Sequence, residues 1–124
     1  MKSDTKWIII TVVVILLIVG GFVWYNNTPG KYDTFAACLK TSGMTFYGAF
    51  WCPHCQAEKA MFGKSVDKLP YVECSTPDGT GQTPICIANG ISEYPTWVTA
   101  AHATTTGVLS IDQLSQMSGC AVPQ

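Results

Sequence analysis

A run of 19 residues without a charged side chain, Trp7–Tyr25, is the feature that most constrains how this chain can fold. As a helix it would rise about 28 Å, close to the thickness of a bilayer core. Its β-branched residues would weaken a helix in water, but backbone groups in lipid must bond internally, which favours the helix. Aromatic residues stand at both ends, as is typical at membrane interfaces. The run therefore predicts one transmembrane helix over 7–25.

Two other interpretations of this run are less consistent with its residues. A cleaved signal peptide would have a shorter apolar region ending in a small-x-small site, whereas this run ends in Gly20-Gly21-Phe22-Val23-Trp24. A buried core helix is disfavoured because the apolar character runs all round the helix. An uncleaved anchor is the prediction that remains.

Lysines near the anchor predict its orientation. Lys2 and Lys6 precede the run and favour a cytoplasmic N-terminus, with Lys31 as the main opposing charge. The expected organisation is a cytoplasmic N-terminus (1–6), a membrane anchor (7–25), a linker (26–31) and a folded domain outside the cytosol (32–124). Periplasm, cell exterior and thylakoid lumen are all compatible locations.

Charge and cysteine content limit the function of the folded domain. The chain contains no arginine, and the part after the linker has fewer lysines than acidic residues. A nucleic-acid partner is excluded, because phosphate binding needs a basic face. All six cysteines lie in this domain, and such a dense, even number predicts an oxidising compartment.

Strand-like and helix-like segments alternate along the domain, which predicts a two-layer or three-layer α/β fold. The helix after Cys52 is expected to direct Ala57, Ala60 and Met61 inward, with a break at Gly63. The expected helices are 33–42, 53–69, 84–89 and 111–118, and the expected strands are 44–50, 71–74, 94–98 and 104–109.

The sequence Cys52-Pro53-His54-Cys55 places two thiols one helical turn apart at a predicted helix N-terminus. Backbone N–H groups and the helix dipole favour a thiolate there, and a protonated His54 would add positive charge. Cys52 is the expected nucleophile, and Cys55 is the expected buried resolving thiol. Proline suits the first helical position because its missing N–H is not needed.

Zinc binding is the main alternative for this pair, but no metal or other cofactor is expected. A structural zinc site usually takes four ligands from two such pairs. Cys74 and Cys86 are twelve positions apart and form no second pair, and His102 stands alone as a surface or hairpin-turn residue.

The remaining cysteines are expected to brace the fold. A Cys74–Cys86 disulfide would close the turn-rich loop between them and stabilise the fold by about 3 kcal/mol. Alternatively, this pair is a second redox pair that relays electrons. Cys38 and Cys120 are left for each other by elimination, although Cys38 could instead meet Cys86.

The element order, Trp51-Cys52-Pro53-His54-Cys55 and Tyr94-Pro95-Thr96 together resemble the thioredoxin superfamily over about residues 32–119. The resemblance implies a thioredoxin fold, in which helices flank a central mixed sheet. It implies that Pro95 is cis, that it lies against the active-site sulfur, and that Tyr94, Pro95 and Thr96 bind substrate peptide. It also implies that Trp51, Pro53 and His54 tune the dithiol, since Pro-His is the pair that DsbA-like oxidants carry.

A closer similarity is to the thioredoxin-like domain of bacterial and plant homologues of vitamin K epoxide reductase. The segments that carry it are 46–55, Tyr71-Val72-Glu73-Cys74, Cys86 and Tyr94-Pro95-Thr96-Trp97. The resemblance implies an extracytoplasmic domain that passes electrons from newly made proteins to a quinone-reducing membrane partner. Because this chain shows only one anchor, the partner is expected in trans, as a vitamin K epoxide reductase-like or DsbB-like protein.

One position departs from the thioredoxin pattern. Many members have a buried acid six residues before the nucleophile, and Phe46 occupies that position here. Glu58 could replace it only if the helix turned it inward, which the predicted apolar stripe does not favour. The sequence therefore does not predict which group exchanges a proton with Cys55.

The expected function is that of a membrane-anchored thiol oxidase, which donates the Cys52–Cys55 disulfide to cysteine-containing exported proteins. Two alternatives are an extracytoplasmic reductase or isomerase, and a non-enzymatic binding module with a thioredoxin fold.

Overall fold

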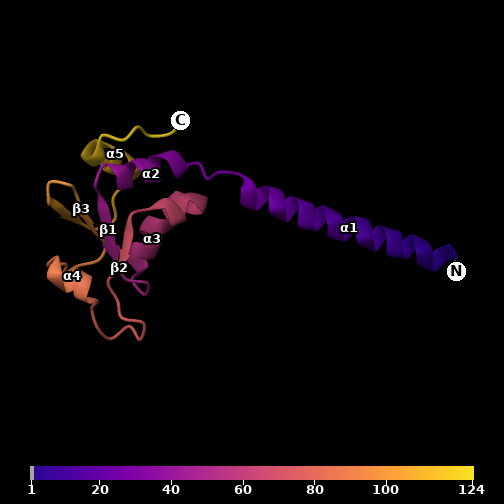
Figure 1. Cartoon of the computed structure of the whole chain (residues 1–124), viewed down its shortest axis with the longest axis horizontal. Helices are drawn as coiled ribbons and strands as arrows, with labels where there is room; N and C mark the ends of the chain where they lie inside the picture. Colours follow the sequence, from indigo (N-terminus) through magenta and orange to yellow (C-terminus); the bar gives the residue numbers. More distant parts are fainter. Residues whose placement is uncertain (1) are drawn as a thin grey trace.

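The computed structural model of the chain describes residues 2–124, so that Met1 of the predicted segment 1–6 lies outside the described residues. The chain forms a mixed α/β domain preceded by one long apolar helix (Figure 1). The helices are α1 (Lys2–Asn27), α2 (Asp33–Thr41), α3 (Pro53–Phe62), the 3-10 helix η1 (Gly63–Lys68), α4 (Pro84–Ala88) and α5 (Ile111–Ser118). The strands are β1 (Thr45–Gly48), β2 (Tyr71–Glu73), β3 (Thr96–Val98) and β4 (Thr104–Thr106).

The four strands form one sheet in the order β2-β1-β3-β4. The central strand β1 runs parallel to β2 and antiparallel to β3, and β4 continues antiparallel at the far edge. Gly48, the last residue of β1, pairs with Glu73 of β2. This pairing brings the end of β2 beside the segment that leads into α3.

Alternate side chains of β1 point to opposite faces of the sheet, and each face has its own hydrophobic cluster. Phe46 belongs to the larger cluster, which is formed with α2, α3 and α5. Its ring stacks on the fully buried Trp97 of β3 with centroids 4.8 Å apart. Tyr47 belongs to the smaller cluster, with Cys74, Cys86 and others. Helices therefore cover both faces of the sheet.

Helix α3 buries a stripe that only partly matches the one predicted. Its buried residues are Cys55, Glu58 and Phe62; the predicted Met61 is partly buried against the core, whereas Ala57 and Ala60 are exposed. The spacing of three and four residues is that of a helix face, but the carboxyl group at its centre made this face look polar in the sequence. The helix also ends earlier than expected, because the chain continues from Gly63 as η1.

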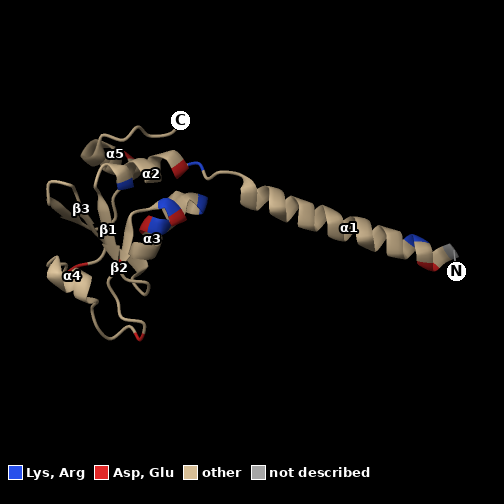
Figure 2. Ribbon diagram, viewed as in Figure 1, with Lys and Arg blue, Asp and Glu red and all other residues tan. Residues whose placement is uncertain are grey.

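Helix α1 projects from the domain (Figure 1), and the side chains of residues 3–27 are exposed. Its charged residues lie near the N-terminal end, and the remainder is uncharged (Figure 2). Among the described residues it is the one helix that is long and apolar enough to cross a membrane, with a candidate span of Ser3–Asn27 and a mean hydropathy of 2.8. The helix is longer at both ends than the predicted segment 7–25.

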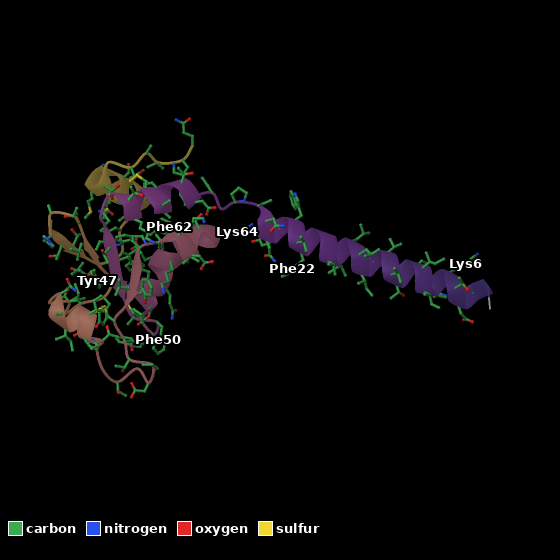
Figure 3. All side chains as sticks on the ribbon, in the orientation of Figure 1. Lys6, Phe22, Tyr47, Phe50, Phe62 and Lys64 are labelled. Carbon is green, nitrogen blue, oxygen red and sulfur yellow. A yellow bond between two sulfur atoms is a disulfide. The ribbon has the colours of Figure 1, made fainter. Side chains whose placement is uncertain are left out.

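A lysine of η1 connects α1 to the domain (Figure 3). The Lys64 ammonium donates hydrogen bonds to the Tyr25 carbonyl, to the Thr28 carbonyl at 2.7 Å and to the Thr28 hydroxyl at 2.8 Å. It also lies 4.2 Å from the centroid of the Tyr25 ring. These contacts hold the C-terminal end of α1 against η1.

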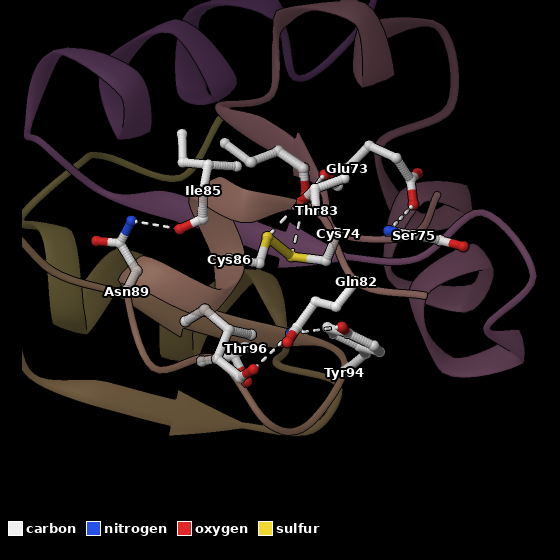
Figure 4. Close-up of a disulfide and its surroundings, with 12 residues drawn as sticks. Glu73, Cys74, Ser75, Gln82, Thr83, Ile85, Cys86, Asn89, Tyr94 and Thr96 are labelled. Atoms are coloured by element: carbon white, nitrogen blue, oxygen red, sulfur yellow. Dashed lines mark hydrogen bonds between the residues drawn. A yellow bond between two sulfur atoms is a disulfide. The ribbon is translucent and has the colours of Figure 1, made fainter. Parts of the chain in front are cut away.

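Four cysteines form the two disulfides expected from the sequence. Cys38 of α2 is bonded to Cys120, just after α5, with an S–S distance of 2.04 Å. Cys74 is bonded to Cys86 of α4 with an S–S distance of 1.97 Å, and the hydroxyl of Thr83 donates to the Glu73 carbonyl beside it (Figure 4). The alternative Cys38–Cys86 bond is not formed. Cys74 and Cys86 are completely buried, which favours a bracing role for their disulfide.

Candidate active site

Cys52 and Cys55 are the two cysteines with free thiols. Strand β1 ends at Gly48, and a short turn leads to Cys52, which is the N-cap of α3 with φ −78° and ψ 118°. Its sulfur accepts a hydrogen bond from the Cys55 N–H at 3.3 Å. Pro53 occupies the first helical position, as predicted. The sequence thus places the Cys52 sulfur at the positive end of a helix, where a negative charge is favoured.

The two thiols differ in access. Cys52 is 5% exposed and Cys55 is 1% exposed, while the neighbouring Phe50 and Trp51 are about half exposed, at 49% and 50%. Beside Cys52 lies a groove of about 540 Å³, lined by Trp51, Cys52, Ser92, Glu93, Tyr94, Thr106 and Gly107. A reactant in this groove reaches Cys52 before Cys55.

The Tyr94-Pro95-Thr96 segment lies against this groove, but its three side chains are placed differently. The Tyr94–Pro95 peptide bond is cis. The Cys52 thiol donates to the Tyr94 carbonyl at 3.7 Å, and the Tyr94 ring meets Trp51 edge-on with centroids 6.0 Å apart. Pro95 and Thr96 are buried, and the Thr96 hydroxyl donates to the Glu93 carbonyl at 2.7 Å. Tyr94 is thus the member of this segment that lines the groove.

The predicted tuning residues are on the exposed side of the motif. Pro53 and His54 are both exposed, whereas Trp51 is fixed by a hydrogen bond from its Nε1 to the Ser75 hydroxyl at 2.9 Å. The loop after β2 also supports Trp51, because the Gly79 backbone lies against the Trp51 and Phe50 rings.

Glu73 is a member of the site that the sequence did not indicate. Its Oε1 accepts hydrogen bonds from the Phe50 N–H at 3.1 Å and the Ser75 N–H at 2.9 Å, and its Oε2 accepts one from the Tyr71 hydroxyl at 2.6 Å. This one carboxylate therefore ties the turn before Cys52 to β2 and the following loop. The parallel pairing of Gly48 with Glu73 puts it there, and that register is a tertiary feature.

Tyr71 lies next to Cys55. A Cβ atom added at Gly48 would be 2.9 Å from Tyr71 Cε2 and 3.0 Å from Cys55 Sγ, so the ring edge and the sulfur lie on either side of one small space. Burial raises the pKa of Tyr71, and its hydrogen bond to Glu73 raises it further. Burial raises the pKa of Cys55 to about 12, and the neighbouring Cys52 thiol adds to the rise. A hydrogen bond from the Ala49 backbone and the charge of Lys59 act in the opposite direction.

Glu58 corrects the prediction that this side chain points outward. It is completely buried, and its Oε2 accepts a hydrogen bond from the Leu109 N–H at 2.8 Å. Its Oε1 has no hydrogen-bond partner, and neither does the Trp97 Nε1. Burial raises the pKa of Glu58 to about 7, while the Leu109 N–H and the nearby Trp97 indole lower it. The structure thus contains a buried acid, Glu58, on α3. Phe46 on β1 stands at the position where the thioredoxin pattern has its buried acid.

The described residues do not gather ligands for a metal ion. In this part of the chain, no three His, Cys, Asp or Glu residues lie close enough together to hold a metal ion. Cys74 and Cys86 are bonded to each other and so have no free thiolate. His102 lies in the turn between β3 and β4, where its N–H donates to the Thr99 carbonyl at 2.9 Å.

Comparison with known proteins finds a redox protein among the relatives of this chain. The thiol-disulfide oxidoreductase LTO1 of Arabidopsis thaliana is 37% identical over 91 residues, which is 69% of this chain. The chain spans 24% of the length of that relative. No family model matches the sequence.

Proposed function

We propose that this chain is a thiol-disulfide oxidoreductase whose Cys52–Cys55 pair cycles between a dithiol and a disulfide. The observation that carries the proposal is the position of Cys52. Its sulfur is at the N-terminus of α3, accepts the Cys55 N–H and borders a groove, while the four remaining cysteines are held in disulfides. The similarity to a plant thiol-disulfide oxidoreductase supports the same activity.

The proposed fold of the domain is that of thioredoxin. Three observations support it: the element order, the sheet order β2-β1-β3-β4 with helices on both faces, and the Tyr94–Pro95 segment opposite the dithiol. In this arrangement the groove beside Cys52 receives an extended substrate peptide. The exposed faces of Phe50 and Trp51 give it apolar contacts, and the backbone next to Tyr94 gives it a strand to pair with.

Oxidation of substrate thiols is the proposed direction. The positive end of α3 and the N–H of Cys55 stabilise a thiolate at Cys52, which favours the reduced form of the pair. A pair whose reduced form is stabilised is a stronger oxidant. The exposed His54 beside Cys52 adds positive charge whenever it is protonated.

The reaction is written so that electrons and protons balance. A substrate thiolate attacks Cys52 Sγ, the Cys52–Cys55 bond breaks, and its electron pair stays on Cys55, which then takes up a proton. A second substrate thiolate attacks the substrate sulfur of the mixed disulfide and releases Cys52 as a thiolate. The substrate loses two electrons and two protons; the pair gains both electrons and one proton, and solvent takes the other proton.

The proposal includes the setting of the reaction. Helix α1 anchors the domain in a membrane, and its apolar length and exposed side chains support this. Lys2 and Lys6 place the N-terminus in the cytoplasm, and two structural disulfides suit an oxidising compartment outside it. The substrates are cysteine-containing exported proteins. A quinone-linked membrane oxidase accepts the electrons and restores the disulfide.

The test is the redox state of Cys52 and Cys55 in cells, measured by alkylation with a mass-shifting thiol reagent after acid quenching. We expect a mostly unmodified, oxidised pair in the wild-type chain. The Cys52→Ala/Cys55→Ala double variant gives the reference position for a chain with no free thiols. The Cys55→Ala variant should accumulate mixed disulfides through Cys52, and mass spectrometry of these adducts identifies the substrates.

Each alternative predicts a different result. A mostly reduced pair would contradict the oxidase proposal and indicate a reductase or isomerase. If Cys52→Ala left thiol exchange and mixed-disulfide trapping unchanged, the enzymatic proposal as a whole would fail, and a binding module would remain.

A further inference from the structure

The buried Cys55 thiol raises a question that the motif does not answer. In the proposed reaction Cys55 is the leaving group and must carry a full negative charge when the disulfide breaks. The helix N-terminus and the Cys55 N–H face the Cys52 sulfur, not that of Cys55. With 1% of its surface exposed, Cys55 has little water to stabilise this charge.

One cation is placed near Cys55. Lys59 follows Cys55 by four residues on α3, so the two side chains lie on adjacent turns of the same face. The Lys59 ammonium is 3.5 Å from the centroid of the Tyr71 ring. The edge of that ring shares the space at Gly48 with the Cys55 sulfur. Lys59 and Cys55 therefore both lie beside the Tyr71 ring.

The tyrosine that holds Lys59 is itself fixed. Its hydroxyl donates to Glu73, whose other oxygen accepts the Phe50 and Ser75 N–H groups. Lys59 is a partly exposed residue, and among the described residues its ammonium makes no ion pair with a carboxylate. Its charge is thus held by the aromatic face, a contact that strengthens as water is removed.

The other side chains around Cys55 do not offer positive charge, and the Ala49 backbone N–H is a neutral donor that also lowers the pKa of Cys55. Cys52, at the start of the same helix as Cys55, and Tyr71, on β2, carry either no charge or a negative one. Glu73 lies behind Tyr71 and is negative when ionised. Glu58 is one turn along α3, and its carboxyl is bound to the Leu109 N–H beside Trp97.

We propose that Lys59 is the charge partner of Cys55, and that its ammonium, held over the Tyr71 ring, stabilises the thiolate that leaves when substrate attacks Cys52. The electron pair of the broken S–S bond stays on Cys55 Sγ, and the thiolate is protonated from solvent afterwards. In the return reaction the same charge favours loss of that proton before the disulfide re-forms. This inference rests on the proposed function and names the residue that adjusts its resolving thiol.

The test compares Lys59→Met, Lys59→Arg and the matched control Lys40→Met in the full chain purified in detergent. Lys40 is exposed on α2, away from the groove. Each protein is prepared in the disulfide form and mixed with a dithiol peptide. Tryptophan fluorescence, to which Trp51 beside the dithiol contributes, follows reduction in a stopped-flow instrument, and rates are corrected for the thiolate fraction of the peptide at each pH.

We expect Lys59→Met to lower the second-order rate constant by about threefold to tenfold, the effect of a leaving thiol one or two pKa units more basic. Lys59→Arg keeps the charge and should stay within about twofold of the wild type, and Lys40→Met should match it. Circular dichroism and the count of intact disulfides identify any variant that has not folded, in which case Lys59→Gln replaces Lys59→Met.

The outcomes separate this inference from the proposed function. If Lys59→Met reacts as fast as wild type, or if Lys59→Arg is slowed equally, the charge role is wrong. If the wild-type disulfide does not react with the peptide at all, or if Cys52→Ala reacts as wild type does, the proposed function itself fails.

Discussion

Replacing Glu58 by glutamine is expected to change how the stability of the protein depends on pH. The carboxyl is completely buried and has one hydrogen bond, from the Leu109 N–H. Burial disfavours its charged form and raises its pKa from 4.5 to about 7. Glutamine has nearly the same shape and can still accept this hydrogen bond through its amide oxygen, but it does not ionise.

The size and sign of the effect follow from the two pKa values. Below pH 4.5 the carboxyl is protonated in both the folded and the unfolded chain. Between pH 4.5 and about 7 the unfolded chain loses this proton while the folded chain keeps it, so the free energy of unfolding falls as pH rises. The total loss is about 3 kcal/mol, and above pH 7 it stays constant.

Chemical denaturation of the full chain, with both disulfides intact, measures the free energy of unfolding at several pH values from 4 to 8. The difference in unfolding free energy, Glu58→Gln minus wild type, should become more positive by about 3 kcal/mol across this range. Glu93→Gln makes the same change at an exposed carboxyl and is the control. Parallel profiles for wild type and Glu58→Gln would show that folding does not shift the pKa of Glu58 and would refute the reasoning.

Two further substitutions test the contacts around the site and the anchor. Gly48→Ala should destabilise the fold by about 1–3 kcal/mol, because its Cβ would lie 2.9 Å from Tyr71 and 3.0 Å from the Cys55 sulfur; unfolding in urea measures this, and an unchanged midpoint would contradict the close packing. Lys64→Met should make the 26–31 linker several-fold easier to cleave by protease, because Lys64 bonds to Tyr25 and Thr28, while Lys40→Met should not. Equal cleavage in both variants would show that these bonds do not hold α1.

Much of the fold could be predicted because its signals are local. Helix α5 has the bounds that were predicted, because Ser110 and Gln113 form a capping box at its start and Gly119 is left-handed at its end. The strands are shorter than expected because their ends have other roles. Beyond Gly48 the chain turns toward Cys52, and the Phe50 N–H donates to the Glu73 side chain instead of a neighbouring strand.

In the candidate site, too, residues that are close in sequence could be predicted, and residues brought together by the fold could not. The two thiols and the proline at the helix start are adjacent in sequence, so the reactive end of α3 could be predicted. Glu73 and Tyr71 could not, because they reach the site only through the parallel register of β1 and β2. Glu58 was predicted on the wrong face, because a charged residue within a buried stripe has the same sequence pattern as a polar helix face.

These differences imply that the two sulfurs of the pair are controlled by different parts of the fold. Cys52 is governed by backbone that the motif itself provides: an N-cap conformation and the N–H of Cys55. Cys55 is governed by burial and by side chains from the next helical turn and from β2. A substitution at Lys59 should therefore change the departure of Cys55 more than the stability of the Cys52 thiolate. Changes within Pro53-His54 should act mainly on the Cys52 thiolate, which contacts the Cys55 thiol and so influences it in turn.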